Sequence, residues 1–222
     1  ERLSRLDGLT LAQAVRDYVA RKRRAKDGLP LKARTQADYL AMIEAGRTSR
    51  SGKKFADGEL HSLAGKFLQA LTAEDIRDLH MALLLRSERQ ATYAMQVLRA
   101  VLRWHGVMVT GNPLGRDTAG RGRIVLPTRK GNPAPIPPEK LGAWWRAAAT
   151  APSQLAADYY RFQLLTGCRG IEIHGYKRHG YAPIKVQDLD ARGGKIVLRD
   201  TKNRSDHKLL LARQALEIAS KH

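Results

Sequence analysis

The sequence predicts a mainly α-helical protein with an N-terminal helical bundle and a partial α+β region that carries a small antiparallel β-hairpin. Three observations support this prediction. Apolar residues recur at helical spacing through most of the first half of the chain. A Pro-, Gly- and Arg-rich stretch then interrupts the pattern. Two short apolar runs near the far end flank a polar turn. We therefore expect a helical unit over residues 9–112, a basic linker over 113–137 and a second unit over 138–222.

The first half contains four stretches that we expect to be helices. Thr10 precedes apolar residues at helical spacing, which predicts an N-cap and one buried helix face. Thr72 and Ser87 are expected to cap the third and fourth helices in the same way. The second helix is expected to begin near Thr35, with Asp38 as its capping-box partner.

The second half mixes helices with a hairpin. Ser153 is expected to begin a helix that ends at the Thr166-Gly167 turn. Residues 195–199 and 208–211 are expected to be the paired strands, and 201–207 the turn between them. A further helix is expected to open at Arg213.

The chain is strongly basic, with 40 Lys and Arg against 21 Asp and Glu over 222 residues, a net charge of +19. Such an excess favours a polyanionic partner, most often nucleic acid. A basic protein kept in solution by its charge, a ribosomal protein or a membrane-surface protein are the alternatives. No apolar run is long enough to span a membrane, and no secretory pattern opens the sequence. A single cysteine and the absence of zinc-ligand spacing fit a reducing compartment without a metal site.

Several basic stretches are candidates for contact with DNA phosphates. Residues 21–24 follow the first helix, where cations either complement the helix dipole or touch DNA. Residues 46–58 are expected to be a basic loop, and the basic linker suggests a clamp around DNA or a plain tether. The candidate DNA-binding residues are Arg21, Lys22, Arg23, Arg24, Lys53, Lys54, Arg99, Arg103, Arg121, Arg123, Arg129, Lys130 and Arg204.

The turn that follows Thr166-Gly167 carries the strongest candidate for chemistry. Arg169 lies at this turn, and Glu172 lies three residues later, on the same face of the helix expected there. A carboxylate so placed can hold the arginine, which then presents a rigid two-donor fork that suits two phosphate oxygens. An ordinary surface ion pair, which contributes little, is the other interpretation of the same two residues.

The order of these features resembles the tyrosine recombinase (phage integrase) family. A basic helical bundle ends in Asn112-Pro113, a basic linker follows, then Thr166-Gly167-x-Arg169-x-x-Glu172, then a hairpin bearing Thr201-Lys202-Asn203. The resemblance covers nearly the whole chain from Leu9. It implies a helical core-binding (SAM-like) domain joined to part of a mixed α/β catalytic domain, which together form a clamp on duplex DNA.

The resemblance also implies roles for three residues. Arg169 would be a catalytic phosphate ligand, Glu172 would support it, and Lys202 would donate a proton to the leaving 5′-hydroxyl. The family cuts DNA with a tyrosine and stores the bond energy in a 3′-phosphotyrosyl intermediate, so the reaction needs no nucleotide cofactor. Arginines already in position stabilise the charge that develops on the phosphate in the transition state. No metal and no other cofactor are expected.

Two departures from the family pattern matter. After the hairpin lysine the family places a His-x-x-Arg motif, then a His or Trp, then the nucleophilic Tyr. The 20 residues that follow Lys202 contain no Tyr and no His-x-x-Arg motif. We therefore expect this chain to be a fragment of a site-specific recombinase for DNA integration, unable to cleave DNA by itself. The stretch 173–183 is also longer than the usual turn, which suggests a DNA-contacting insertion or a loose alignment.

Two other functions stay open at this point. The first is a non-catalytic DNA-binding regulator or directionality factor with a recombinase-like clamp, and the second is an RNA-binding basic protein. For a recombinase of a mobile element we expect duplex DNA as partner, self-association on DNA as a dimer or tetramer, no membrane, and a location in the bacterial cytoplasm on the nucleoid.

Overall fold

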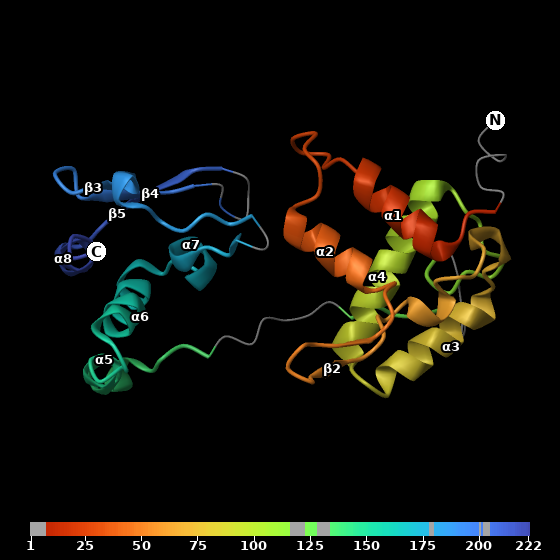
Figure 1. Ribbon diagram of the computed structural model, residues 1–222, viewed down its shortest axis with the longest axis horizontal. Coiled ribbons are helices and arrows are strands. Elements are labelled where there is room, and N and C mark those ends of the chain that lie inside the picture. The colour runs from red at the N-terminus through yellow and green to blue at the C-terminus, as the bar shows by residue number, and fades with distance from the viewer. Residues whose placement is uncertain (1–7, 116–122, 128–133, 178–179, 200, 202–204) are drawn as a thin grey trace. The chain divides into compact units, whose positions relative to one another are not determined.

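The computed structural model describes residues 8–115, 123–127, 134–177, 180–199, 201 and 205–222. The chain divides into two compact units, Glu1–Lys130 and Gly131–His222 (Figure 1). Mainly helical structure with small antiparallel sheets is present, as the sequence predicted. Among the described residues, no helix is both long enough and apolar enough to cross a membrane.

The part of the first unit that the structure describes contains four α-helices. They are α1 (Leu11–Arg21), α2 (Ala33–Ala41), α3 (Ala73–Leu84) and α4 (Glu88–His105). The longest, α4, packs against both α1 and α3. Two short 3-10 helices, His61–Leu63 and Leu68–Ala70, complete the path between α2 and α3.

One hydrophobic core unites these elements, and α4 contributes most to it. Its buried face repeats at helical spacing, as the sequence indicated. The large side chains that are fully buried in the unit are Leu11, Leu60, Leu68, Ile76, Met95, Leu98 and Leu102. Truncation of one of these leucines to alanine would cost about 2–5 kcal/mol of stability.

Local capping fixes where three of these helices begin. The Thr10 hydroxyl accepts a hydrogen bond from Gln13 N, and Gln13 Oε1 accepts one from the backbone N–H of Thr10. Thr72 makes the same reciprocal arrangement with Asp75. The Ser87 hydroxyl accepts from Gln90 N. These three starts confirm the predicted caps.

The predicted start of α2 is wrong. The helix begins after Lys32, without a side-chain cap, so that Thr35 lies inside its first turn. Asp38 instead binds Arg34 four residues earlier, Nε to carboxylate at 2.9 Å. A favourable i,i+4 ion pair on the helix surface thus uses the carboxylate that a capping box would need.

The loop expected over residues 46–58 is instead a β-hairpin. Its strands are β1 (Arg47–Thr48) and β2 (Lys54–Phe55), paired antiparallel. Two-residue strands leave no periodic signal in the sequence. The N-terminal unit is therefore helical with one small sheet, not purely helical.

In its described residues, the second unit combines four α-helices with a three-stranded antiparallel sheet in the order β3-β4-β5. The helices are α5 (Leu141–Ala148, preceded by the 3-10 turn Pro138–Lys140), α6 (Gln154–Thr166), α7 (Gly170–His174) and α8 (Arg213–Ala219). The strands are β3 (Leu189–Asp190, which follows the 3-10 turn Val186–Asp188), β4 (Lys195–Leu198) and β5 (His207–Leu210).

The core of this unit is small. It consists of Phe162 from α6, Ile196 from β4, and Ala215 and Ile218 from α8. The central strand β4 pairs with β5 as the predicted hairpin, and with β3, which the sequence did not indicate as a strand. Between α7 and β3, the chain folds back on itself through a bridge of Tyr176 with Tyr181.

Candidate functional site

The α6–α7 turn places Arg169 and Glu172 together. α6 ends at Gly167, whose φ of 66° is the left-handed conformation that glycine adopts without strain. Arg169 is then the N-cap residue of α7. Glu172 accepts two hydrogen bonds from it, Oε2 from the backbone N–H at 2.9 Å and Oε1 from Nη1 at 2.9 Å. One carboxylate therefore fixes both the helix start and the arginine side chain.

The exposure of the pair suits an anion ligand. The Glu172 side chain is 12% exposed, whereas that of Arg169 is 64% exposed. Within the described part of the chain, the guanidinium has no other hydrogen-bond partner, so most of its N–H donors face solvent. Such a tethered guanidinium can donate two parallel hydrogen bonds to a phosphate.

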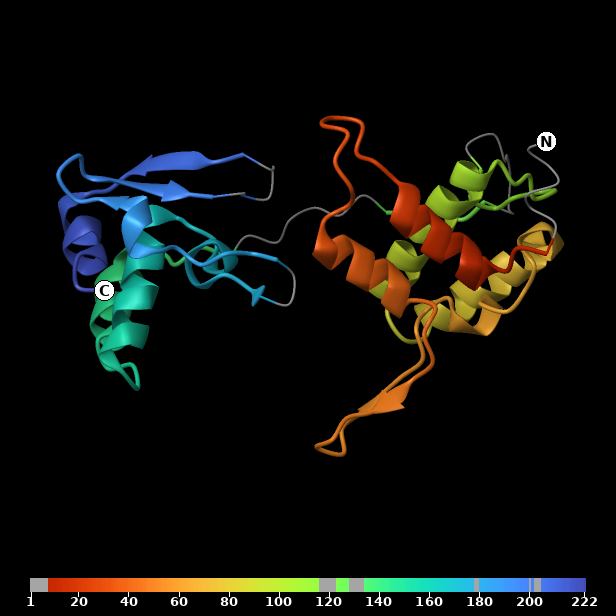
Figure 2. The same ribbon diagram turned by 45° about the horizontal axis from the view of Figure 1, so that its top comes forward.

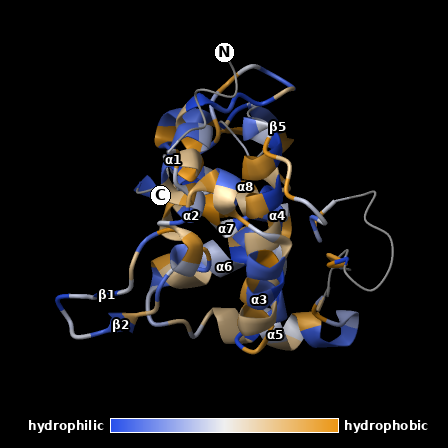
Figure 3. Cartoon of the chain, turned by 90° about the vertical axis from the view of Figure 1, so that its right-hand side faces the viewer, coloured by the Kyte–Doolittle hydropathy of each residue, from blue (hydrophilic) through white to orange (hydrophobic). Residues whose placement is uncertain are grey.

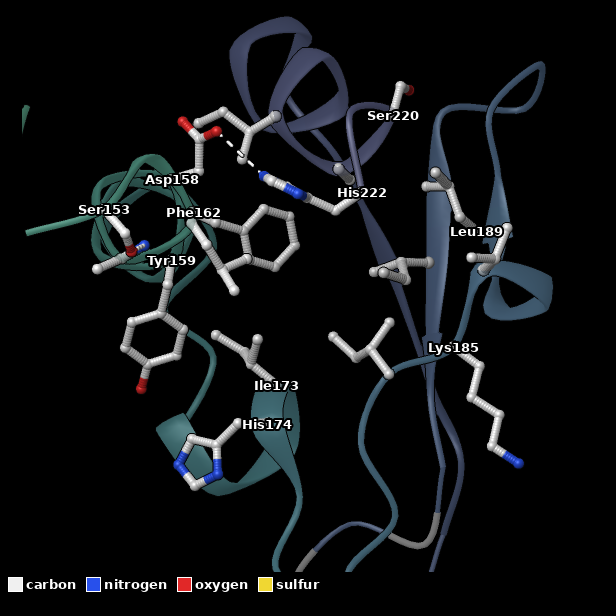
Figure 4. A pocket seen from close by; sticks show the side chains of 17 residues that line it. Ser153, Asp158, Tyr159, Phe162, Ile173, His174, Lys185, Leu189, Ser220 and His222 are labelled. Atoms are coloured by element: carbon white, nitrogen blue, oxygen red, sulfur yellow. Dashed lines mark hydrogen bonds and ion pairs between the residues drawn. The ribbon is translucent and has the colours of Figure 1, made fainter.

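Two aromatic side chains pack beneath this turn. A Cβ on Gly170 would lie 2.6 Å from the Tyr159 hydroxyl, so α7 sits directly on that side chain. The ring of His174 lies 6.1 Å from the Tyr159 ring (Figure 4). Sequence reasoning missed Tyr159, because α6 brings it to the turn from ten residues away. The neighbouring Cys168 is buried, and burial raises the pKa of its thiol, so it is a packing residue rather than a nucleophile.

An apolar hollow of about 910 Å³ opens beside α6, α8 and the sheet (Figure 4). Asp158 lies at its edge, 2% exposed, and accepts hydrogen bonds from Gln154 at 3.0 Å and from His222 at 3.1 Å. Burial acts to raise the pKa of Asp158, but the hydrogen bonds from Gln154 and His222 outweigh it, so this pKa lies below its ordinary value. The carboxylate is thus charged, and its hydrogen bond with His222 links α6 to the residues that follow α8.

The β4–β5 turn, where the motif lysine was expected, is anchored at both ends. Thr201 N and Oγ1 both donate to Ser205 O, at 3.1 and 2.9 Å. Arg199 Nε donates to the buried Asp188 at 2.6 Å and Nη1 lies 3.7 Å from Asp206. Burial acts to raise the pKa of Asp188, but the bond from Arg199 and a backbone N–H outweigh it and lower the pKa. Lys202 and Arg204 themselves lie outside the described residues.

The basic run after α1 does not form one continuous strip. Arg21 pairs with Asp17 at 2.8 Å, and Arg24 pairs with Asp27 at 3.1 Å. Lys22 Nζ lies 5.1 Å above the ring of Trp104 on α4, a cation–π contact. Arg23 donates to backbone carbonyls, Nη1 to Ala20 O at 3.0 Å. Two of the four cations thus have acidic partners that compete with phosphate.

A polar hollow beside α4 is lined by three arginines, more than the basic run after α1 brings together at one place. Its lining includes Arg89 and Arg99 of α4, and Arg123 from the segment after the bundle. Tyr93 lies between them, with its pKa raised to about 12, mainly by burial. Sequence reasoning selected Arg99 and Arg123 but missed Arg89. Ten residues separate Arg89 from Arg99, which is about 80° short of three helical turns, so the spacing alone did not indicate that the two line one hollow.

The remaining candidates are dispersed or not described. Lys53 and Lys54 lie on the β1–β2 hairpin, and Arg103 lies exposed on α4. Arg121, Arg129, Lys130, Lys202 and Arg204 fall outside the described residues, so the predicted meeting of Arg169 with Lys202 is not described either. Over the described ranges of the chain, no group of three or more His, Cys, Asp or Glu is arranged to hold a metal.

Comparisons with known proteins cover both units. Residues 10–109 match the phage integrase core-binding domain. The chain is 26% identical over 212 residues to the prophage integrase IntF of Escherichia coli (strain K12), a match that covers 89% of this chain and 42% of IntF. The chain therefore spans less than half the length of this curated relative.

The fold resembles that of the Tn1549 transposon integrase. One structure, in complex with transposon right end DNA, matches with a TM-score of 0.60 and 12% identity over 96% of this chain and 64% of that chain. A second, in complex with circular intermediate DNA, matches with a TM-score of 0.59 and the same identity and coverage.

Proposed function

The core-binding domain, the fold and the motifs support membership of the tyrosine recombinase family, and on that premise we propose that this chain is part of a site-specific DNA recombinase. The whole protein would cut and rejoin duplex DNA through a 3′-phosphotyrosyl intermediate. The observation that carries this proposal is the α6–α7 turn, where Glu172 holds an exposed Arg169 by two hydrogen bonds.

In this proposal Arg169 binds the scissile phosphate. Attack on phosphorus by a tyrosine hydroxyl increases negative charge on the non-bridging oxygens, and a guanidinium already in place stabilises that charge without reorganising. Glu172 is a positioning residue, since it touches the arginine and not the DNA. Because the Glu172 side chain is only 12% exposed, water competes little for its hydrogen bonds with Arg169.

We place Lys202 as the proton donor to the 5′-oxygen that leaves when the DNA strand breaks. An ammonium lowers the barrier to expelling an alkoxide by donating its proton as the bond breaks. Two features support this assignment. Thr201 and Ser205 close the turn around the lysine, and Arg199 bonds to a buried carboxylate at its base, so the turn has a fixed stem.

The N-terminal unit would supply most of the grip on duplex DNA. Its candidate contacts are the α4 hollow, the basic run after α1 and the β1–β2 hairpin. In the cell the protein would act on bacterial DNA at the nucleoid, and copies of it would assemble on their target as a dimer or tetramer. The 3′-phosphotyrosyl step requires a tyrosine and the arginine of a His-x-x-Arg motif, and residues 203–222 contain neither a tyrosine nor that motif.

Two measurements test this function. The chain of 222 residues should bind mixed-sequence duplex DNA with an affinity that falls steeply as salt rises, and should bind structured RNA more weakly under the same salt. A longer form that includes a downstream tyrosine should leave a covalent 3′-phosphotyrosyl product on a nicked suicide substrate. Tight DNA binding without a covalent product at any length would instead support the non-catalytic regulator. Preference for RNA would contradict both.

A further inference from the structure

The β1–β2 hairpin is the least expected feature of the first unit. Residues 45–57, here named the arm, project away from the four helices as a separate finger (Figure 2). Its tip is a closed turn, in which Ser49 N donates to Lys53 O at 2.8 Å and Gly52 N donates to Ser49 O at 2.9 Å. All of its residues except Ser49 are exposed, so the arm contributes nothing to the hydrophobic core.

The base of the arm is held at a set position by close backbone approach. A Cβ on Gly46 would lie 2.5 Å from the carbonyl oxygen of Phe55, so only glycine fits there without a shift. Gly58 is pressed equally closely against the backbone of Met42 at the end of α2. Asp57 Oδ1 also accepts a hydrogen bond from Gly46 N at 2.6 Å. The arm is therefore a built projection rather than a slack loop.

The arm carries positive charge on both of its faces. Arg47 lies opposite Phe55 in the ladder, and Thr48 lies opposite Lys54. Since side chains alternate along a strand, Arg47, Lys53 and Phe55 share one face, while Lys54 occupies the other. Figure 3 shows the hydrophilic end of the arm beyond β1 and β2. No acidic residue lies between Glu44 and Asp57.

An exposed aromatic ring organises the cations on one face. Phe55 is 43% exposed, with the guanidinium carbon of Arg47 5.5 Å and Lys53 Nζ 5.4 Å from its ring centre. These cation–π contacts hold two long side chains in defined positions before any partner binds. Phe55 is a solvent-exposed hydrophobic residue between two cations, and the arm that carries it does not contribute to the core. This combination indicates a binding surface for a partner.

We propose that the arm enters the major groove of duplex DNA, a step that rests on the proposed recombinase function. A ribbon with cations on only one face would match the outside of a single phosphate backbone. Cations on both faces match a groove, whose two walls are both lined with phosphates. The major groove of B-form DNA is about 12 Å wide and admits a two-stranded β-ribbon, whereas the minor groove, at about 6 Å, takes strands when the DNA is deformed. Arg47 and Lys53 then face one wall, Lys54 faces the other, and Arg50 at the tip reaches toward the base edges.

The first test measures the phosphates that the arm neutralises. The variant Arg47→Gln/Lys53→Gln/Lys54→Gln should lower the slope of log affinity against log salt by about 2 to 3 on a mixed-sequence duplex, since each phosphate contributes about 0.9. The matched control Arg47→Lys/Lys53→Arg/Lys54→Arg keeps all charges and should keep the slope. Thermal unfolding should be unchanged in both variants, because these side chains are exposed. An unchanged slope in the Gln variant overturns the proposal.

The second test identifies the groove. The loss of affinity caused by the Gln variant is compared on an unmodified duplex, on one whose cytosines carry glucosylated 5-hydroxymethyl groups in the major groove, and on one whose minor groove holds netropsin. The expected loss disappears on the glucosylated duplex and persists with netropsin. The opposite pattern, or equal loss on all three, overturns the proposal. If the wild-type chain binds no duplex at all, both the recombinase function and the arm proposal are overturned. If wild type and the arm variants all bind duplex with the same steep salt dependence, only the arm proposal is overturned.

Discussion

Asp75, at the start of α3, offers a quantitative test of the fold of the N-terminal unit. Its Oδ2 accepts three hydrogen bonds, from Lys66 Nζ at 2.6 Å, Thr72 Oγ1 at 2.7 Å and Thr72 N at 2.8 Å. The carboxylate thus closes the capping box of α3 and ties it to the preceding segment. The substitution Asp75→Asn keeps the shape and removes the charge, so it mimics a permanently protonated Asp75.

The pKa of Asp75 gives the expected loss of stability in the Asp75→Asn variant. The hydrogen bond from Lys66, followed by those from Thr72, lowers the pKa of Asp75 to about 2. Since a tenfold change in an ionisation constant corresponds to about 1.4 kcal/mol, the charged form stabilises the folded unit by about 2 kcal/mol. The folded pKa lies below the unfolded one. The contribution is therefore complete above about pH 4 and is lost as the pH falls toward about 2.

Thermal unfolding followed by far-UV circular dichroism measures this effect. At neutral pH, Asp75→Asn should lower the Tm of the N-terminal unit by about 10 °C, and the difference from wild type should vanish as the pH approaches about 2. The control Asp78→Asn removes an exposed carboxylate from the same helix and should change Tm little. A difference that stays constant down to pH 2 would refute the assigned role of the Asp75 charge.

Two further changes test the second unit. Gly170→Ala should destabilise the α6–α7 turn by about 1–3 kcal/mol, because its Cβ would meet the Tyr159 hydroxyl, and the double variant with Tyr159→Phe should recover most of the loss in chemical denaturation. Full additivity of the two substitutions would show that they do not touch. Arg199→Met should destabilise the unit and raise the pKa of Asp188, because the buried carboxylate then loses its cationic partner. An NMR pH titration of Asp188 in this variant checks the prediction, and an unchanged Asp188 pKa would contradict it.

Local chemistry explains which parts of the fold could be predicted from the sequence. Thr10, Thr72, Ser87 and Ser153 each cap a helix through a backbone N–H three residues away, so the relevant atoms lie within one turn of sequence. The start of α2 could not be predicted, because it has no side-chain cap.

The two missed sheet elements depend on distant partners. Strand β3 exists only through its pairing with β4, Leu189 opposite Ile196, and two residues carry no alternation to recognise. The arm depends on the approach of Gly46 to the backbone of its own second strand at Phe55, and of Gly58 to the backbone at the end of α2. Neither contact leaves a local signal in the sequence.

In the candidate site, too, the contacts between residues close in sequence could be predicted, and those between distant residues could not. The relation of Arg169 to Glu172 could be predicted because i,i+3 spacing brings the two side chains to one helix face. The packing of Tyr159 against the turn could not, because it requires the relative placement of α6 and α7. The acidic partners of Arg21 and Arg24 lie four and three residues away, respectively, and a count of positive charges alone overlooked them.

The most direct test of the account is strand cleavage by Arg169→Ala in a longer form of the protein that carries a nucleophilic tyrosine. On a nicked suicide substrate, the variant should form covalent product at least about 100-fold more slowly than wild type, as expected for loss of one preorganised donor to the transition state. Its affinity for the same duplex should stay within a few-fold, because the other basic residues remain. Product formation at the wild-type rate, or a loss of binding as large as the loss of cleavage, would contradict a catalytic contact between Arg169 and the scissile phosphate.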